Sequence, residues 1–68
     1  MSEVINIRLV EPGSKVRLAD GSTAEVVTNF QDGVWLSVTY LTSPNDPSLE
    51  GTEEMVFAQD VLELLETP

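Results

Sequence analysis

Most residue types that carry enzyme chemistry are absent from this chain. It contains no cysteine and no histidine, which removes thiolate catalysis and zinc sites of the usual kind. The six serines have no histidine to activate them, and Lys15 is expected to pair with Glu25. The sequence therefore predicts a protein that is not an enzyme and that uses no cofactor.

Carboxylates are the remaining groups that could act on a substrate or hold a metal ion. Glu53 and Glu54 are adjacent, but neighbouring side chains of a strand point to opposite faces, so this pair diverges. The stretch DPSLEGTEE (46–54) resembles the opening of an EF-hand calcium loop, with oxygen-bearing side chains at alternate positions. Phe57 stands at the twelfth position, where that loop requires a bidentate glutamate. A polar hinge loop is the preferred interpretation, and no metal site is predicted.

Charge is the most unusual property of the sequence. Twelve acidic residues face three basic ones, the formal net charge at pH 7 is −9, and no lysine or arginine follows Arg17. Such a field repels phosphate backbones and attracts basic surfaces. The sequence therefore predicts a protein partner with a basic surface and no direct contact with nucleic acid. The alternative explanation is that the charge only keeps a small, apolar-rich chain soluble.

Length and composition predict one small domain over residues 1–68. A chain of 68 residues buries only about 60% of the surface that its unfolded form exposes, so its core is thin. The absence of cysteine is typical of a reducing, cytoplasmic setting. No apolar run approaches the roughly 18 residues that a membrane-spanning helix needs, so no membrane association is predicted.

Alternation of apolar and polar residues predicts an all-β fold. Two Asp-Gly pairs separate three alternating segments, which indicates a meander of three strands. Near the carboxyl end, two further strands are predicted on either side of a single tight turn, with a continuous helix over 53–66 as the alternative. The predicted strands are an additional amino-terminal strand at 4–10, then 15–19, 22–30, 34–41, 54–57 and 61–65.

The register of the meander follows from the length of its turns. Two-residue loops would mix polar and apolar residues on both faces, whereas three-residue loops with glycine in the left-handed conformation separate them. In that register Val16 faces Ala24 across the first turn. Across the second turn, Thr28 faces Leu36. The predicted core face consists of Val16, Leu18, Ala24, Val26, Phe30, Val34, Leu36, Val38 and Tyr40.

The same register places the single tryptophan, Trp35, on the opposite face, with Val27 as its diagonal neighbour. Two interpretations of this position remain open. The strand predicted at 4–10 covers Trp35 in a minor second core, or pairs with a second copy of the chain to give a homodimer. Otherwise Trp35, Val27 and Leu41 form an exposed apolar spot with an acidic rim, which is typical of a binding anchor.

Two segments resemble parts of SH3 domains. DGVWLSV (32–38) resembles their tryptophan strand, and MVFAQDVLELLE (55–66) resembles their closing strand, one-turn helix and final strand. GSKVRLA (13–19) with FAQDVLEL (57–64) is also similar to the SH3-like subunit at the ferredoxin-docking side of photosystem I. The resemblance covers roughly residues 13–66.

What the resemblance implies is a small SH3-like barrel of five to six antiparallel strands, with a one-turn helix before the last strand. Of the site with which SH3 domains bind proline-rich peptides, only Trp35 carries over, because Leu36 stands where those domains have a second tryptophan. Members of this fold commonly act as protein-interaction, nucleic-acid-binding or enzyme-accessory modules, so the fold alone does not select a function.

These observations predict a protein-interaction module, monomeric or homodimeric, that binds a basic or apolar protein surface through its acidic face. The alternatives are an acidic DNA-mimic inhibitor of a nucleic-acid-binding protein and a small accessory subunit of an enzyme complex. The candidate partner-binding residues are Trp35, Val27, Leu41, Glu50, Glu53 and Glu54.

Overall fold

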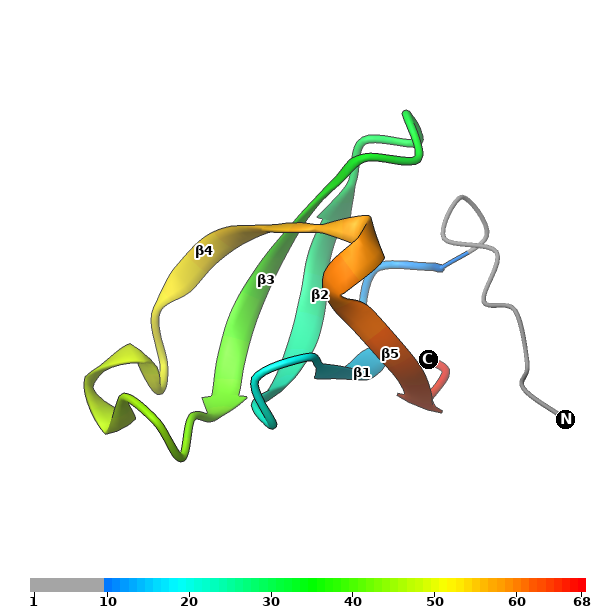
Figure 1. Cartoon of the computed structure of the whole chain (residues 1–68). Coiled ribbons are helices and arrows are strands. Elements are labelled where there is room, and N and C mark those ends of the chain that lie inside the picture. The colour runs from blue at the N-terminus through cyan, green and yellow to red at the C-terminus, as the bar shows by residue number, and fades with distance from the viewer. Residues whose placement is uncertain (1–9) are drawn as a thin grey trace, which may run out of the picture.

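A computed structural model describes residues 10–68, and this part of the chain is all-β (Figure 1). The amino-terminal strand predicted at 4–10 lies outside the described residues, except for Val10. The elements are, in chain order, β1 (Lys15–Leu18), β2 (Thr23–Asn29), β3 (Trp35–Thr42), the 3-10 turn η2 (Pro47–Leu49), β4 (Glu53–Phe57), the 3-10 turn η3 (Ala58–Asp60) and β5 (Val61–Glu66).

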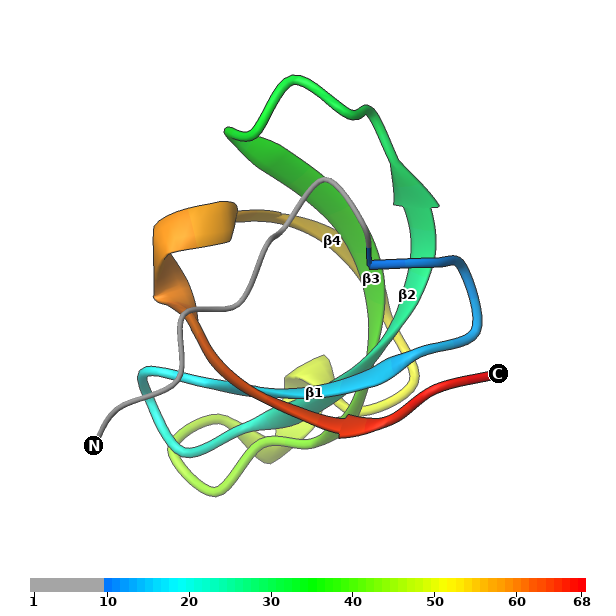
Figure 2. The same ribbon diagram turned by 90° about the vertical axis from the view of Figure 1, so that its right-hand side faces the viewer.

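The five strands form one antiparallel sheet in the order β4-β3-β2-β1-β5. The sheet curls until its two outermost strands approach each other, and η3 joins them directly (Figure 2). This arrangement is compatible with the small barrel that the resemblance to SH3 domains implies. A continuous helix over 53–66 is wrong, because two strands and a 3-10 turn occupy that range.

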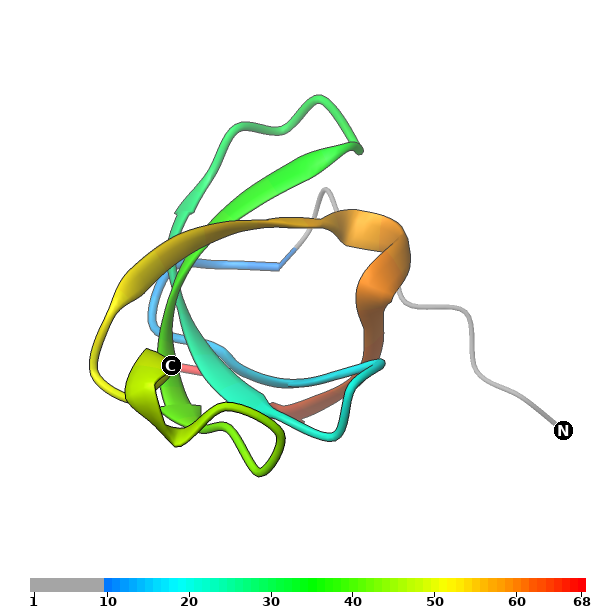
Figure 3. The same cartoon turned by 60° about the vertical axis from the view of Figure 1, so that its left-hand side comes forward.

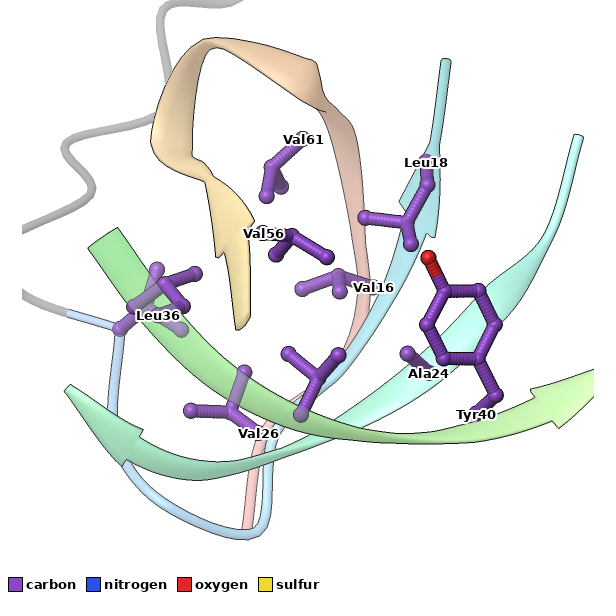
Figure 4. Packing of buried hydrophobic residues seen from close by; sticks show 10 residues of the cluster. Val16, Leu18, Ala24, Val26, Leu36, Tyr40, Val56 and Val61 are labelled. Atoms are coloured by element: carbon purple, nitrogen blue, oxygen red, sulfur yellow. The ribbon is translucent and has the colours of Figure 1, made fainter. Parts of the chain in front are cut away.

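The hydrophobic core lies inside the curl (Figure 4). Seven of the nine residues predicted for the core face are buried there, and Val10, Val56 and Val61 complete the cluster. Val61 begins β5 directly after η3, so this turn brings the last strand back over the open side of the sheet. The members of the core are Val10, Val16, Leu18, Ala24, Val26, Leu36, Val38, Tyr40, Val56 and Val61.

At the first turn the predicted register is confirmed. Val16 faces Ala24, and Gly21 has a φ of +89°, the left-handed conformation that the three-residue loop requires. Lys15 faces Glu25 as expected, but its ammonium group forms an ion pair with Glu66 of β5 instead. The expected partner is displaced because β5 lies on the other side of β1, a neighbour that the meander alone does not reveal.

At the second turn the predicted register is wrong. The ladder follows the prediction as far as Val26, which faces Val38. A bulge comes next, so Thr28 faces Ser37 rather than Leu36. The bulge inserts one extra residue into β2, and the remaining pairs are displaced by one position.

Side-chain hydrogen bonds within the loop explain the shift. Asn29 Oδ1 accepts a hydrogen bond from the Gln31 amide at 2.8 Å. Asp32 Oδ1 accepts from the amides of Val34 and Trp35 at 2.8 and 3.0 Å. Short polar side chains that bond the backbone in this way offer it an alternative to ladder pairing. The backbone at Gln31, with a φ of +60°, therefore turns earlier than the glycine of the loop alone would require.

This geometry removes Phe30 and Val34 from the predicted core face. The two side chains are 50% and 47% exposed, and neither belongs to the core cluster. The loop that carries them projects beyond the body of the sheet (Figure 1). The core is therefore smaller at this end than the alternating pattern predicts.

Candidate partner-binding face

One face of β4, β3 and β2 points away from the core and has an aromatic end and an acidic end. The β3–β4 ladder pairs Trp35 with Phe57 and Thr39 with Glu53. Alternate residues of a strand share a face, so all positions of this parity point away from the buried Leu36. We refer to this surface as the outer face; its positions on these strands are Glu25, Trp35, Ser37, Thr39, Glu53, Met55 and Phe57.

The aromatic end of the outer face is a stacked pair of rings. The centroids of Trp35 and Phe57 are 4.2 Å apart, and the ring planes meet at 25°. Trp35 is half-buried and Phe57 is 43% exposed, and neither belongs to the core. Such a pair contributes about 0.5–1.5 kcal/mol beyond the area that it buries. The sequence-based placement of Trp35 outside the core is confirmed.

Backbone bonds hold this end of the face in position. The Trp35 amide donates to Asp32 Oδ1, as described above, and the Ala58 amide donates to the carbonyl oxygen of Val34 at 2.7 Å. Ala58 follows Phe57 directly, so the two residues that carry the rings are anchored at the same point. The backbone of the sheet therefore holds the two rings in position.

The acidic end of the outer face is ordered by a buried serine. Ser37 Oγ donates a hydrogen bond to Glu53 Oε2 at 2.9 Å, although Ser37 itself is only 6% exposed. Phe57 is four positions beyond Glu53 along β4, a span of about 13 Å. Met55, which lies between them on the same side of β4, is 54% exposed. The face thus offers a carboxylate at one end and aromatic rings at the other, with a flexible apolar side chain between.

The structure brings only some of the predicted binding residues together. Trp35 and Glu53 share the outer face. Val27, which is 39% exposed, lies at the β2 bulge, next to the position that faces Ser37. Leu41 is six residues beyond Trp35 along β3, about 20 Å away, so the two do not form one apolar spot.

Two of the predicted glutamates lie elsewhere. Glu50 Oε2 accepts a hydrogen bond from the Ser43 amide at 3.1 Å, which places this carboxylate within the β3–β4 loop. Glu54 faces Val38 in the ladder and therefore lies on the opposite side of β4 from Glu53. These two residues are not part of the outer face.

Phe57 and Met55 belong to the face and were not predicted. The signal available was the alternation of Glu53, Met55 and Phe57, which puts these three side chains on one side of a strand. What the sequence did not supply was the register of that strand against β3, because the intervening loop is too long to dictate it.

Within residues 10–68, the positive charge lies on β1, which β2 separates from β3 and β4. Lys15 Nζ lies 2.8 Å from Glu66 Oε2, and Arg17 lies 3.0 Å from Glu63. The hydrogen bond and charge of Lys15 lower the pKa of Glu66, and Glu66 in turn raises the pKa of Lys15. Both cations within residues 10–68 are therefore engaged by β5, and β3 and β4 contain none.

Within the described range, no group of three or more acidic side chains is arranged to hold a metal ion. The stretch that resembles an EF-hand opening bonds to itself, since Asp46 Oδ1 accepts from the Ser48 amide at 3.2 Å. None of the helical turns between residues 10 and 68 is long and apolar enough to cross a membrane.

Known proteins do not assign a function to the outer face. No protein-family model matches the chain, and neither a curated protein nor a solved structure matches it significantly. The function is therefore argued from the outer face itself.

Proposed function

We propose that this chain is a non-enzymatic protein-interaction module that binds a basic protein surface through the outer face. The observation that carries the proposal is the partly exposed Trp35–Phe57 stack at one end of a face whose other end presents Glu53. Stacked, partly exposed aromatic rings bind apolar side chains and the planar guanidinium group of arginine.

Charge complementarity selects the class of partner. The formal net charge is −9, and the two described cations, both on β1, are paired with glutamates of β5. A basic partner is therefore attracted over long range and meets no positive charge on β3 or β4. A cytoplasmic partner accords with the absence of cysteine.

The distribution of the carboxylates favours this proposal over a DNA mimic. A mimic needs carboxylates arranged along one face like phosphates along a strand. Here Asp20 lies in the β1–β2 turn, Asp46 in the β3–β4 loop and Asp60 in η3, while Glu53 lies on the outer face. An accessory subunit of an enzyme complex would use the same outer face, and is a special case of the proposed function.

The test is a titration of the isotope-labelled protein with a synthetic amphipathic peptide of lysine, arginine and leucine, followed by NMR. We expect chemical-shift changes concentrated at Trp35, Phe57, Met55 and Ser37. An acidic peptide of glutamate and leucine should leave these signals unchanged. Raising the salt concentration should weaken the binding of the basic peptide.

Two variants make the test specific. Met55→Lys places a positive charge on the outer face without touching the core, and we expect it to weaken binding about tenfold, by like-charge repulsion. Leu62→Ala is the matched control, since Leu62 is 59% exposed but lies on β5. The proposed function would be refuted if the two variants weakened peptide binding equally, or if the affinity for the basic peptide did not change with salt concentration.

A further inference from the structure

A second feature, separate from the outer face, lies where the β1–β2 turn meets η3. A cavity of about 180 Å³ opens there between the two segments. Figure 3 shows this turn, in cyan, beside η3, in orange. The Ala19 amide donates a hydrogen bond to the Asp60 carbonyl oxygen at 2.8 Å, which ties the two walls together. The lining residues are Leu18, Ala19, Asp20, Tyr40, Val56 and Asp60.

The cavity has the size of one side chain. Sites for drug-sized ligands usually measure about 300–1,000 Å³, whereas a cavity of about 150 Å³ is enough for benzene. Leu18 and Val56 form apolar walls, and the Tyr40 ring lies beside them in the core cluster (Figure 4). An occupant therefore needs an apolar stem of a few carbon atoms.

The hydroxyl group of Tyr40 faces this cavity. Tyr40 is 9% exposed, and its hydroxyl group points toward Leu18, into the cavity that both residues line (Figure 4). Within residues 10–68 this hydroxyl group forms no hydrogen bond. No buried side-chain oxygen or nitrogen of the described chain lacks a partner, so solvent reaches the Tyr40 hydroxyl oxygen. An occupant that displaces this solvent has to offer the hydroxyl group a polar atom in its place.

The charge at the mouth of the cavity is negative. Asp20 and Asp60 both line it, from opposite walls. Burial, followed by the charges of Asp20, Glu54 and Asp60, raises the pKa of Tyr40. No lysine or arginine of the described chain is paired with these three carboxylates. A cation is therefore the occupant that this mouth favours.

We propose that the cavity receives one lysine side chain of the basic protein partner, with the methylene stem against Leu18 and Val56 and the ammonium group among Asp20, Asp60 and the Tyr40 hydroxyl oxygen. This inference rests on the proposed function, because it takes the partner to be a basic protein.

The chemistry selects lysine over two other cations. An ammonium group is a compact charge with three donors, which matches three acceptors that come from separate elements. A guanidinium group is a wide planar fork that prefers one bidentate carboxylate. A hard divalent cation needs six or more oxygen ligands, and only two carboxylates line this cavity.

The experiment uses the whole chain and three capped pentapeptides of glycine with lysine, norleucine or arginine at the centre. NMR titrations should show that the lysine peptide shifts the signals of Leu18, Val56 and Tyr40. The norleucine peptide, which has the stem without the charge, should leave them unchanged. The arginine peptide should bind more weakly than the lysine peptide.

Single substitutions show which groups of the cavity contribute to binding of the lysine peptide. Tyr40→Phe removes only the hydroxyl oxygen, and Asp60→Asn removes only a charge, so both should keep the fold. Each should weaken the lysine peptide about fivefold, the upper end of what a partly exposed polar contact contributes. Glu11→Gln is the matched control, since it removes an exposed carboxylate that does not line the cavity. Backbone NMR spectra of each variant check the fold.

The outcomes separate this inference from the proposed function. Shifts at Trp35 and Phe57 with none at Tyr40 would overturn the lysine pocket and leave the outer face standing. Shifts at Tyr40 that Met55→Lys does not alter would support the pocket even if the outer face failed. A Glu11→Gln effect equal to that of Asp60→Asn would overturn the pocket, because binding would then follow net charge alone.

Discussion

The two faces of β3 are alternate residues of one strand, but different constraints determine them. On the inner face, Leu36 and Val38 are completely buried, and they belong to the core that the alternating pattern predicts. On the outer face, Trp35 is half-buried because one specific neighbour, Phe57, stacks on it. A strand's own sequence thus defines its core face, whereas strand pairing determines which side chains meet on its outer face.

The largest expected effect is on the inner face. Leu36→Ala should lower the free energy of unfolding by about 2–5 kcal/mol, through lost burial and the cavity that remains. For a domain of this size that is much of the total stability. Phe57→Ala, on the outer face, should lower the free energy of unfolding by a clearly smaller amount. Urea denaturation of both variants measures this difference. Equal losses of unfolding free energy would show that the inner and outer faces contribute equally to stability.

The stacked rings of the outer face should be coupled energetically. In a double-mutant cycle of Trp35→Leu and Phe57→Leu, we expect a coupling free energy of about 0.5–1.5 kcal/mol. The cycle is measured by chemical denaturation, followed by circular dichroism because one variant lacks the tryptophan. Strictly additive losses would mean that the stack does not contribute to stability.

Tyr40 makes the inner face sensitive to alkaline pH. Its pKa is raised above the ordinary value of 10.0 by burial and then by Asp20, Glu54 and Asp60. A raised folded-state pKa contributes stability that is present below pH 10 and is lost as the pH rises through that pKa. Tyr40 is the only tyrosine, so the absorbance of tyrosinate reports it directly. Tyr40→Phe should reduce the loss of stability above pH 10, and an unchanged loss would contradict this assignment.

Self-repulsion should be visible as a response to salt. With a net charge of −9, moderate salt or acidification toward pH 5 should raise the melting temperature, since both weaken repulsion between carboxylates. Calorimetry at several ionic strengths measures the response. A melting temperature that falls as salt is added would contradict it.

The smallest effect is expected at the exposed ion pair of Lys15 and Glu66. The lowered pKa of Glu66 means that its contribution is present above the unfolded pKa and is lost as the pH falls through the folded one. Because solvent reaches both side chains, which are 41% and 61% exposed, Glu66→Gln should change the melting temperature only slightly at pH 7. The difference in melting temperature between variant and wild type should be smaller at pH 3 than at pH 7. A larger difference at pH 3 would contradict the stabilising role of ionised Glu66.

The sequence was sufficient for the fold class and for most of the core. Strict alternation located β1, β2 and β3, and the turn with Gly21 determined the first register because its neighbouring strands bury one face. The pattern also placed a tight turn before the last strand, where η3 lies.

The remaining errors have two physical causes. At the second turn, the side-chain oxygens of Asn29 and Asp32 accept hydrogen bonds from backbone amides, in competition with ladder pairing. The residue pattern does not show which of the two sets of hydrogen bonds forms. The pairing of Trp35 with Phe57 depends on two strands separated by a ten-residue loop. Contacts of that kind form through tertiary packing, and local alternation carries no information about them.

The most direct test of the outer face is the emission of its single tryptophan during binding. On addition of the basic amphipathic peptide, Trp35 fluorescence should shift to shorter wavelength as the ring loses water, and Met55→Lys should move this shift to about tenfold higher peptide concentration. Calorimetry in parallel establishes whether the peptide binds. Heat of binding with no change in Trp35 emission would contradict the assignment of this face as the partner-binding site.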